Sequence, residues 1–124
     1  MEILDLKERE WDINRNLQEI EEHLDEFRKI QKDLDGLEEE SYWQNTRIKE
    51  INDTLLDNYP KDTRLQSLLV EKEEILQQKV SYERCFWEDA RDILSNEIRK
   101  KEQQEEDYKE ELLFLEQNKE EVEE

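Results

Sequence analysis

The chain has 124 residues, of which 46% are charged and 33% hydrophobic, and its formal net charge is −19 at pH 7. It has a single glycine and a single proline, and this composition, poor in turn residues and rich in Glu, Lys, Leu and Gln, is typical of a few long helices. Nucleic acids and anionic lipids are bound by basic patches, which the sequence lacks. We therefore expect no nucleic-acid partner and no membrane partner.

Cysteine content and the N-terminal sequence indicate a cytoplasmic protein. The single Cys85 excludes an internal disulfide framework. No apolar run approaches the roughly 18 residues of a membrane span, and Met1 is followed by acidic residues rather than a basic and then apolar signal segment. Low hydrophobicity and high net charge would also fit disorder, but disorder does not predict apolar residues kept in heptad register.

A three-four spacing of apolar residues runs from Ile3 to Leu55 and predicts a first long helix. Thirteen of the sixteen positions in this spacing are apolar, and the three exceptions are Glu10, Ser41 and Gln44. The step from Phe27 to Ile30 is three where four is due, which predicts a stammer, a local overwinding of the supercoil.

Gly36 lies inside this predicted helix, where glycine costs up to about 1 kcal/mol relative to alanine. One interpretation is a tolerated weak spot, and the other is a close approach or bend. Ser41 with Gln44 also fits a capping box, which would begin a new helix after a break, although the periodicity on either side favours continuity.

The segment Asn58–Asp62 contains Pro60 and is the only convincing break in the pattern. Thr63 with Gln66 forms a capping box for a second helix, and Asp62 is the competing cap. Because the loop is short, the fold class predicted is an all-α, antiparallel two-helix hairpin, a long coiled coil. The expected single domain comprises helix one over 1–57, a loop over 58–63, helix two over 64–118 and an acidic frayed tail over 119–124.

Between Leu65 and Ile98, helix two carries two apolar stripes about 100° apart, a face too wide for one neighbouring helix to cover. The first stripe is expected to pack on helix one. The predicted hairpin core is Leu17, Ile20, Leu24, Phe27, Leu34, Ile48, Ile51, Leu65, Leu69, Leu76, Val80, Trp87 and Leu94. The second, which we call the outer stripe, is predicted to bind a partner and consists of Leu68, Ile75, Tyr82, Phe86 and Ile93.

The open end of the hairpin is predicted to be clasped by Trp11, Tyr108, Leu112 and Leu115. This end is also strongly acidic, since residues 102–124 contain eleven acidic and two basic residues, and residues 1–12 contain five and two. It is interpreted either as a solvated end or as an acidic pole for a basic partner.

Catalytic and metal-binding patterns are missing from the sequence. The only histidine, His23, lies among acidic residues and is expected at the surface. Cys85, beside Phe86, is expected to be a semi-buried apolar residue rather than a reactive thiol. There is no glycine-rich phosphate loop, nucleophile elbow or zinc spacing. We therefore predict a protein that is not an enzyme, with no catalytic residues, metal or cofactor.

Two segments resemble a known family. The aromatic patch Tyr82-Glu-Arg-Cys-Phe-Trp87 and the segment Gln103-Gln-Glu-Glu-Asp-Tyr-Lys-Glu-Glu-Leu-Leu-Phe-Leu115 are similar to the small helical proteins encoded beside LXG-domain toxins of the Gram-positive type VIIb secretion system. The resemblance implies that this chain and a second small helical protein bind the helical LXG domain as chaperones or targeting factors before export.

The chain departs from the secreted WXG100 proteins in two respects. Tyr59-Pro60-Lys61 replaces their Trp-x-Gly turn, and no Tyr or Phe is followed four residues later by an acidic residue, as in the export signal of that system. The resemblance therefore implies a partner that binds the toxin without supplying the secretion signal. Two alternatives from other classes are an acidic inhibitor that mimics nucleic acid and a structural coiled-coil adaptor, and the second stripe also allows a homodimer.

Overall fold

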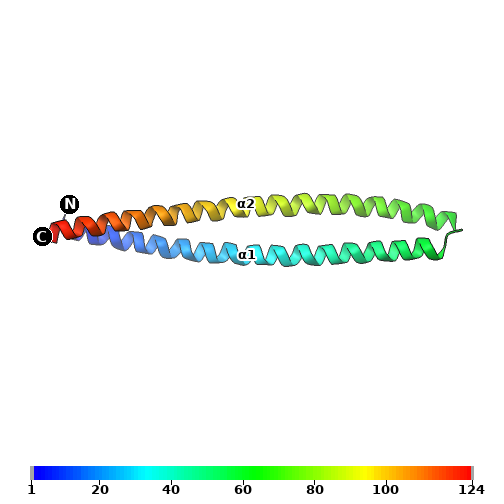
Figure 1. Cartoon of the computed structure of the whole chain (residues 1–124), viewed down its shortest axis with the longest axis horizontal. Helices are drawn as coiled ribbons and strands as arrows, with labels where there is room; N and C mark the ends of the chain where they lie inside the picture. The colour runs from blue at the N-terminus through cyan, green and yellow to red at the C-terminus, as the bar shows by residue number, and fades with distance from the viewer. Residues whose placement is uncertain (1, 124) are drawn as a thin grey trace. The chain divides into compact units, whose positions relative to one another are not determined.

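A computed structural model describes residues 2–123 of the chain. Helix α1 spans Ile3–Asn58 and helix α2 spans Thr63–Glu123, and the described residues contain no strand. The two helices pack against each other as an antiparallel hairpin (Figure 1), which confirms the predicted fold class. The hairpin divides into unit 1, from Met1–Ile30 and Ile93–Glu124, and unit 2, from Gln31–Asp92.

The turn in unit 2 begins and ends within one residue of the prediction. The backbone N–H of Leu65 donates to Oδ1 of Asp62 at 3.0 Å, so Asp62 caps α2 and the Thr63 capping box is wrong. The Gln66 side-chain amide instead reaches back across the turn and donates to the carbonyl oxygens of Leu56 at 3.1 Å and Tyr59 at 2.8 Å. Gln66 thereby satisfies the Leu56 carbonyl, whose helical partner would be Pro60, which has no N–H, while the Tyr59 carbonyl also accepts from the backbone N–H of Asp62 at 3.3 Å.

The C-terminal end of α2 lies beyond the predicted boundary. The helix continues to Glu123, whereas we predicted that it ends at residue 118 and that a frayed tail follows. Residues 119–123 contain only Lys, Glu and Val, with no glycine or proline to end the helix. Residue 124 lies outside the described residues.

Helix α1 passes through Gly36 without interruption. A Cβ atom built on Gly36 would meet nothing within 4 Å, so the interpretation of a close approach is wrong. Ser41 lies within the same helix, so the proposed break and new cap are wrong as well. The simpler interpretation remains, a glycine at an exposed helical position.

The inward-facing positions of α1 show no stammer. After Phe27 the next partly buried residue is Gln31, a regular step of four, whereas the predicted Ile30 is exposed. The same heptad then continues through unit 2 at positions 34, 38, 41, 45, 48, 52 and 55, all of them partly buried except Ile48, which is exposed. The inward series of α1 in unit 2 is therefore rich in polar residues, among them Glu38, Ser41 and Asn45.

The two units have different cores. In unit 1, Leu6, Ile13 and Leu115 form a buried cluster, and Leu17, Tyr108 and Leu112 pack against it. Ile20, Leu24 and Leu94 are also buried in unit 1. In unit 2 only Leu69 and Leu76, both from α2, are buried. Unit 2 is therefore held by a thin apolar core together with polar contacts.

Candidate functional site

A polar layer crosses the helix interface of unit 2. Glu83 occupies an inward position of α2, and its carboxylate accepts hydrogen bonds from the Ser41 hydroxyl and, at 3.0 Å, from the Asn45 side-chain amide. Lys79 Nζ donates to Oδ1 of Asn45 at 3.2 Å and lies 3.5 Å from Oε1 of Glu83. The four side chains satisfy one another, as polar groups at such positions must.

The hydrogen bond from Ser41 is the main cause that lowers the pKa of the Glu83 carboxyl below its ordinary value of 4.5. The hydrogen bond from Asn45 and the charge of Lys79 act in the same direction, and partial burial opposes them. A carboxyl with a lowered pKa in the folded state stabilises the fold above its ordinary pKa. That contribution is lost as pH falls through the lower folded-state pKa.

We therefore expect the difference in unfolding free energy between the natural chain and Glu83→Gln to shrink between pH 7 and pH 3. Urea unfolding across this range measures that difference directly. The exposed Glu88 on the same helix, replaced by glutamine, is the control for the general effect of removing one acid. A difference that stays constant with pH would show that ionised Glu83 does not stabilise the layer.

Ion pairs also link the helices within each unit. In unit 2, Arg91 donates to Asp35 at 2.7 Å and contacts Glu38. In unit 1, Arg9 makes two hydrogen bonds to Glu111, at 2.7 and 3.0 Å. These groups are partly exposed, so each pair adds little stability. Together the pairs show which residues of α1 and α2 lie opposite each other in each unit.

A groove of about 530 Å³ lies along one flank of unit 2, beside the polar layer. Tyr42 and Lys49 of α1 line it, with Gln77 and Arg84 of α2. Leu76, Val80 and the half-buried Trp87 form its apolar floor. Among the described residues no three His, Cys, Asp or Glu side chains are grouped as a metal ion would require.

The outer stripe of α2 is exposed at every position. In unit 2, the exposed fractions of Leu68, Ile75, Tyr82 and Phe86 are 49%, 52%, 77% and 54%. Ile93, which belongs to unit 1, is likewise exposed. Phe86 packs its ring edge-on against Trp87, with ring centres 5.1 Å apart and planes at 75°. These apolar side chains are thus left without cover by α1.

Ile48 and Ile51 were predicted in the hairpin core, and that prediction is wrong. Their exposed fractions are 41% and 50%, and Leu37 is exposed in the same way. For Ile51 the reason is the regular heptad of α1, which turns Asn45 and Asn52 inward and leaves Ile51 on the flank, whereas Ile48 lies on the inward series itself and is nevertheless exposed.

The remaining core residues have two degrees of burial. Those that are buried are Ile20, Leu24, Leu69, Leu76 and Leu94. Those that are half-buried are Leu17, Phe27, Leu34, Leu65, Val80 and Trp87.

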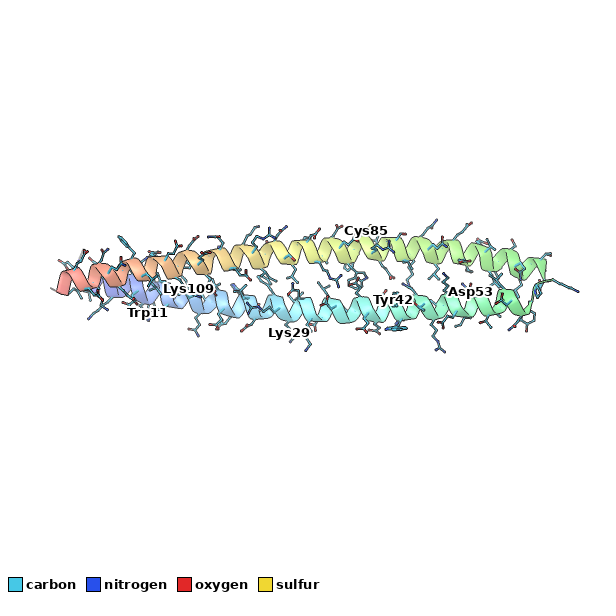
Figure 2. The ribbon with its side chains drawn as sticks, viewed as in Figure 1. Trp11, Lys29, Tyr42, Asp53, Cys85 and Lys109 are labelled. Carbon is cyan, nitrogen blue, oxygen red and sulfur yellow. The ribbon has the colours of Figure 1, made fainter. Side chains whose placement is uncertain are left out.

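The predicted clasp is correct for its α2 residues and wrong for Trp11. Leu115 is buried, and Tyr108 and Leu112 pack against it. Trp11 (Figure 2) is 62% exposed. Its ring centre lies 5.8 Å from the Arg15 guanidinium. Helical geometry explains the error, because Trp11 follows the inward position 10 by one residue and is rotated about 100° from it.

The aliphatic partners of this cluster, Leu6 and Ile13, were missing from the predicted site residues. Both lie on the three-four series that starts at Ile3, so the signal was present in the sequence. Asn16, on the same helix, donates a hydrogen bond to the Tyr108 hydroxyl at 3.4 Å.

Two further residues bear on the predictions about chemistry. His23 is exposed, as predicted. Cys85 is exposed on α2 (Figure 2), which corrects the prediction of a semi-buried residue. It lies one residue before the outer-stripe Phe86 and two after the inward Glu83, so it points away from α1.

The described helices contain no stretch that is long and apolar enough to cross a bilayer. No protein family, curated protein or solved structure matches the chain. The resemblance to the toxin-associated helical proteins therefore remains a hypothesis.

Proposed function

We propose that this chain is a non-catalytic helical binding protein whose outer stripe receives a further helix and so completes a larger bundle. The observation that carries the proposal is the exposure of Leu68, Ile75, Tyr82 and Phe86 along one side of α2. Helices that dock on other helices are recognised through apolar residues at this heptad spacing. Buried aromatic side chains supply much of the energy at such interfaces.

The thin core of unit 2 supports the same proposal. Only Leu69 and Leu76 are buried there, and the polar layer around Glu83 replaces an apolar contact. Covering the outer stripe would add apolar burial at about 25 cal/mol per Å². An additional helix thus supplies stabilisation that the unit lacks by itself.

The resemblance to proteins encoded beside LXG-domain toxins suggests the helix that is bound. We propose a helical LXG domain as the partner, bound in the cytoplasm before export together with a second small helical protein. In this role the chain acts as a chaperone or targeting factor.

The double substitution Tyr82→Ala with Phe86→Ala is expected to weaken binding of a co-expressed LXG domain by about 2 kcal/mol, roughly 30-fold in the dissociation constant. The helicity of the free chain should stay nearly unchanged, because both side chains are exposed. Calorimetric titration gives the affinity and circular dichroism gives the helicity.

The matched control is Tyr42→Ala with Trp43→Ala. These two exposed aromatic residues on α1 pack edge-on at 5.5 Å and 74°, much as Phe86 and Trp87 do, but lie outside the outer stripe. Loss of binding in the control alone would place the interface elsewhere. Equal binding by all three proteins would refute the outer stripe as the binding surface.

A further inference from the structure

Charged residues are segregated along the face of unit 2 that carries the outer stripe. This outer face comprises two heptad series, residues 68–89 of α2 through the outer stripe and residues 33–54 of α1 through Leu37 and Ile51. In an antiparallel pair these series lie on the same flank, opposite the groove. The basic members are Arg47, Lys72 and Lys79, and the acidic members are Asp33, Glu40 and Asp89.

The two signs of charge occupy opposite halves of this face. The contacts of Ser41 and Asn45 with Glu83 and of Asp35 with Arg91 show which residues of the two helices lie opposite each other, and on average they place Tyr82 opposite position 44. All three basic residues lie between this level and the turn, and all three acidic residues lie on the side away from the turn.

We propose that a second copy of the chain covers the outer face, with the two copies running in opposite directions. The inference rests on the proposed function, because it names what occupies the outer stripe in the free protein. A two-fold axis at the level of Tyr82 makes the interface self-complementary. The basic half of each face then lies on the acidic half of the other.

The register of this arrangement follows from the residue numbers. Arg47 comes level, within one residue, with Glu40 of the second copy, and Leu37 comes level with Ile51 of the second copy. Lys72 lies within three residues, about 4.5 Å along the helix, of Asp89 of the second copy. The long lysine side chain spans such an offset.

The same arrangement also limits repulsion between the chains. In a parallel dimer each basic half would face the other basic half, and like charges so placed are costly. Unit 1 carries a net charge of −12 and is joined to unit 2 through residues 31 and 92. In the antiparallel dimer, the junctions of one copy lie at the opposite end from the junctions of the second copy. In a parallel dimer, the junctions of both copies lie at the same end.

Charge reversal on the outer face tests the proposal with the full chain alone. Sedimentation equilibrium at micromolar concentration is expected to show a dimer for the natural chain. Arg47→Glu with Lys72→Glu should weaken association at least about tenfold, and so should Glu40→Lys with Asp89→Lys. An equimolar mixture of the two variants should restore a one-to-one dimer, because every reversed charge again meets its opposite.

The matched control is Lys49→Glu with Arg84→Glu, which makes the same change in charge on the groove flank. It should leave the dimer intact, and Tyr82→Ala with Phe86→Ala should abolish it. A monomeric natural chain, or a mixture that fails to associate, would overturn the proposal. A monomer that still binds an LXG domain through the outer stripe would overturn only this inference and leave the proposed function standing.

Discussion

Replacing Ile13 with alanine is expected to lower the unfolding free energy by about 2 to 5 kcal/mol. Ile13 has no exposed surface and lies in the cluster with Leu6 and Leu115. The loss combines the missing apolar burial with the cavity left between α1 and α2. Urea unfolding followed by circular dichroism measures the change.

Trp11→Ala provides the comparison, because it removes a larger side chain two residues away. Trp11 is exposed and its ring contacts the Arg15 guanidinium, so its loss should change stability by no more than about 0.5 kcal/mol. If Trp11→Ala proved as destabilising as Ile13→Ala, the tryptophan would belong to the core of unit 1 after all.

The second large effect concerns the polar layer of unit 2. Replacing Ser41, Asn45 and Glu83 together with leucine is expected to raise the unfolding free energy by about 1 to 4 kcal/mol, because an apolar layer replaces an ionised group. Glu83→Leu alone should instead cost about 1 to 3 kcal/mol, since Ser41 and Asn45 then lose their acceptor. Urea unfolding of both variants shows whether the unfolding free energy rises in the triple variant and falls in Glu83→Leu.

The same triple substitution should loosen the pairing register of the helices. A single polar position in a coiled coil fixes register at a cost in stability. We expect more than one set of amide resonances for unit 2 in the triple variant and one set in the natural chain. A triple variant that is less stable than the natural chain would show that the layer contributes to stability rather than to register.

The helices and the turn could be predicted from sequence because their signals are local. Pro60 ends α1, and the heptad of apolar residues in unit 1 has no competing series. In unit 2 the local signal was misleading, since the apolar Ile48 and Ile51 lie close to the polar residues that face inward. Asn45 is turned inward because Glu83 and Lys79 meet it from α2, and residue spacing along one helix does not reveal such a partner.

The outer stripe was predicted because its residues recur beside an inward series on α2 that is already mostly apolar. On the α1 half of the same face, Ile51 was predicted in the core instead, and Leu37 was not among the predicted site residues. Its segregated charges could be recognised only after the cross-helix contacts showed which residues lie level. The position of Asp89 relative to Glu40, for example, follows from the Asp35–Arg91 contact.

The division into two units also sets an order of events during synthesis. Unit 2 is complete once residue 92 has been made, and its helices are joined by a short turn that costs little entropy to close. Unit 1 pairs residues about a hundred positions apart, such as Arg9 with Glu111. On the ribosome, the apolar stripe through Leu6 and Ile13 is therefore made first and covered last.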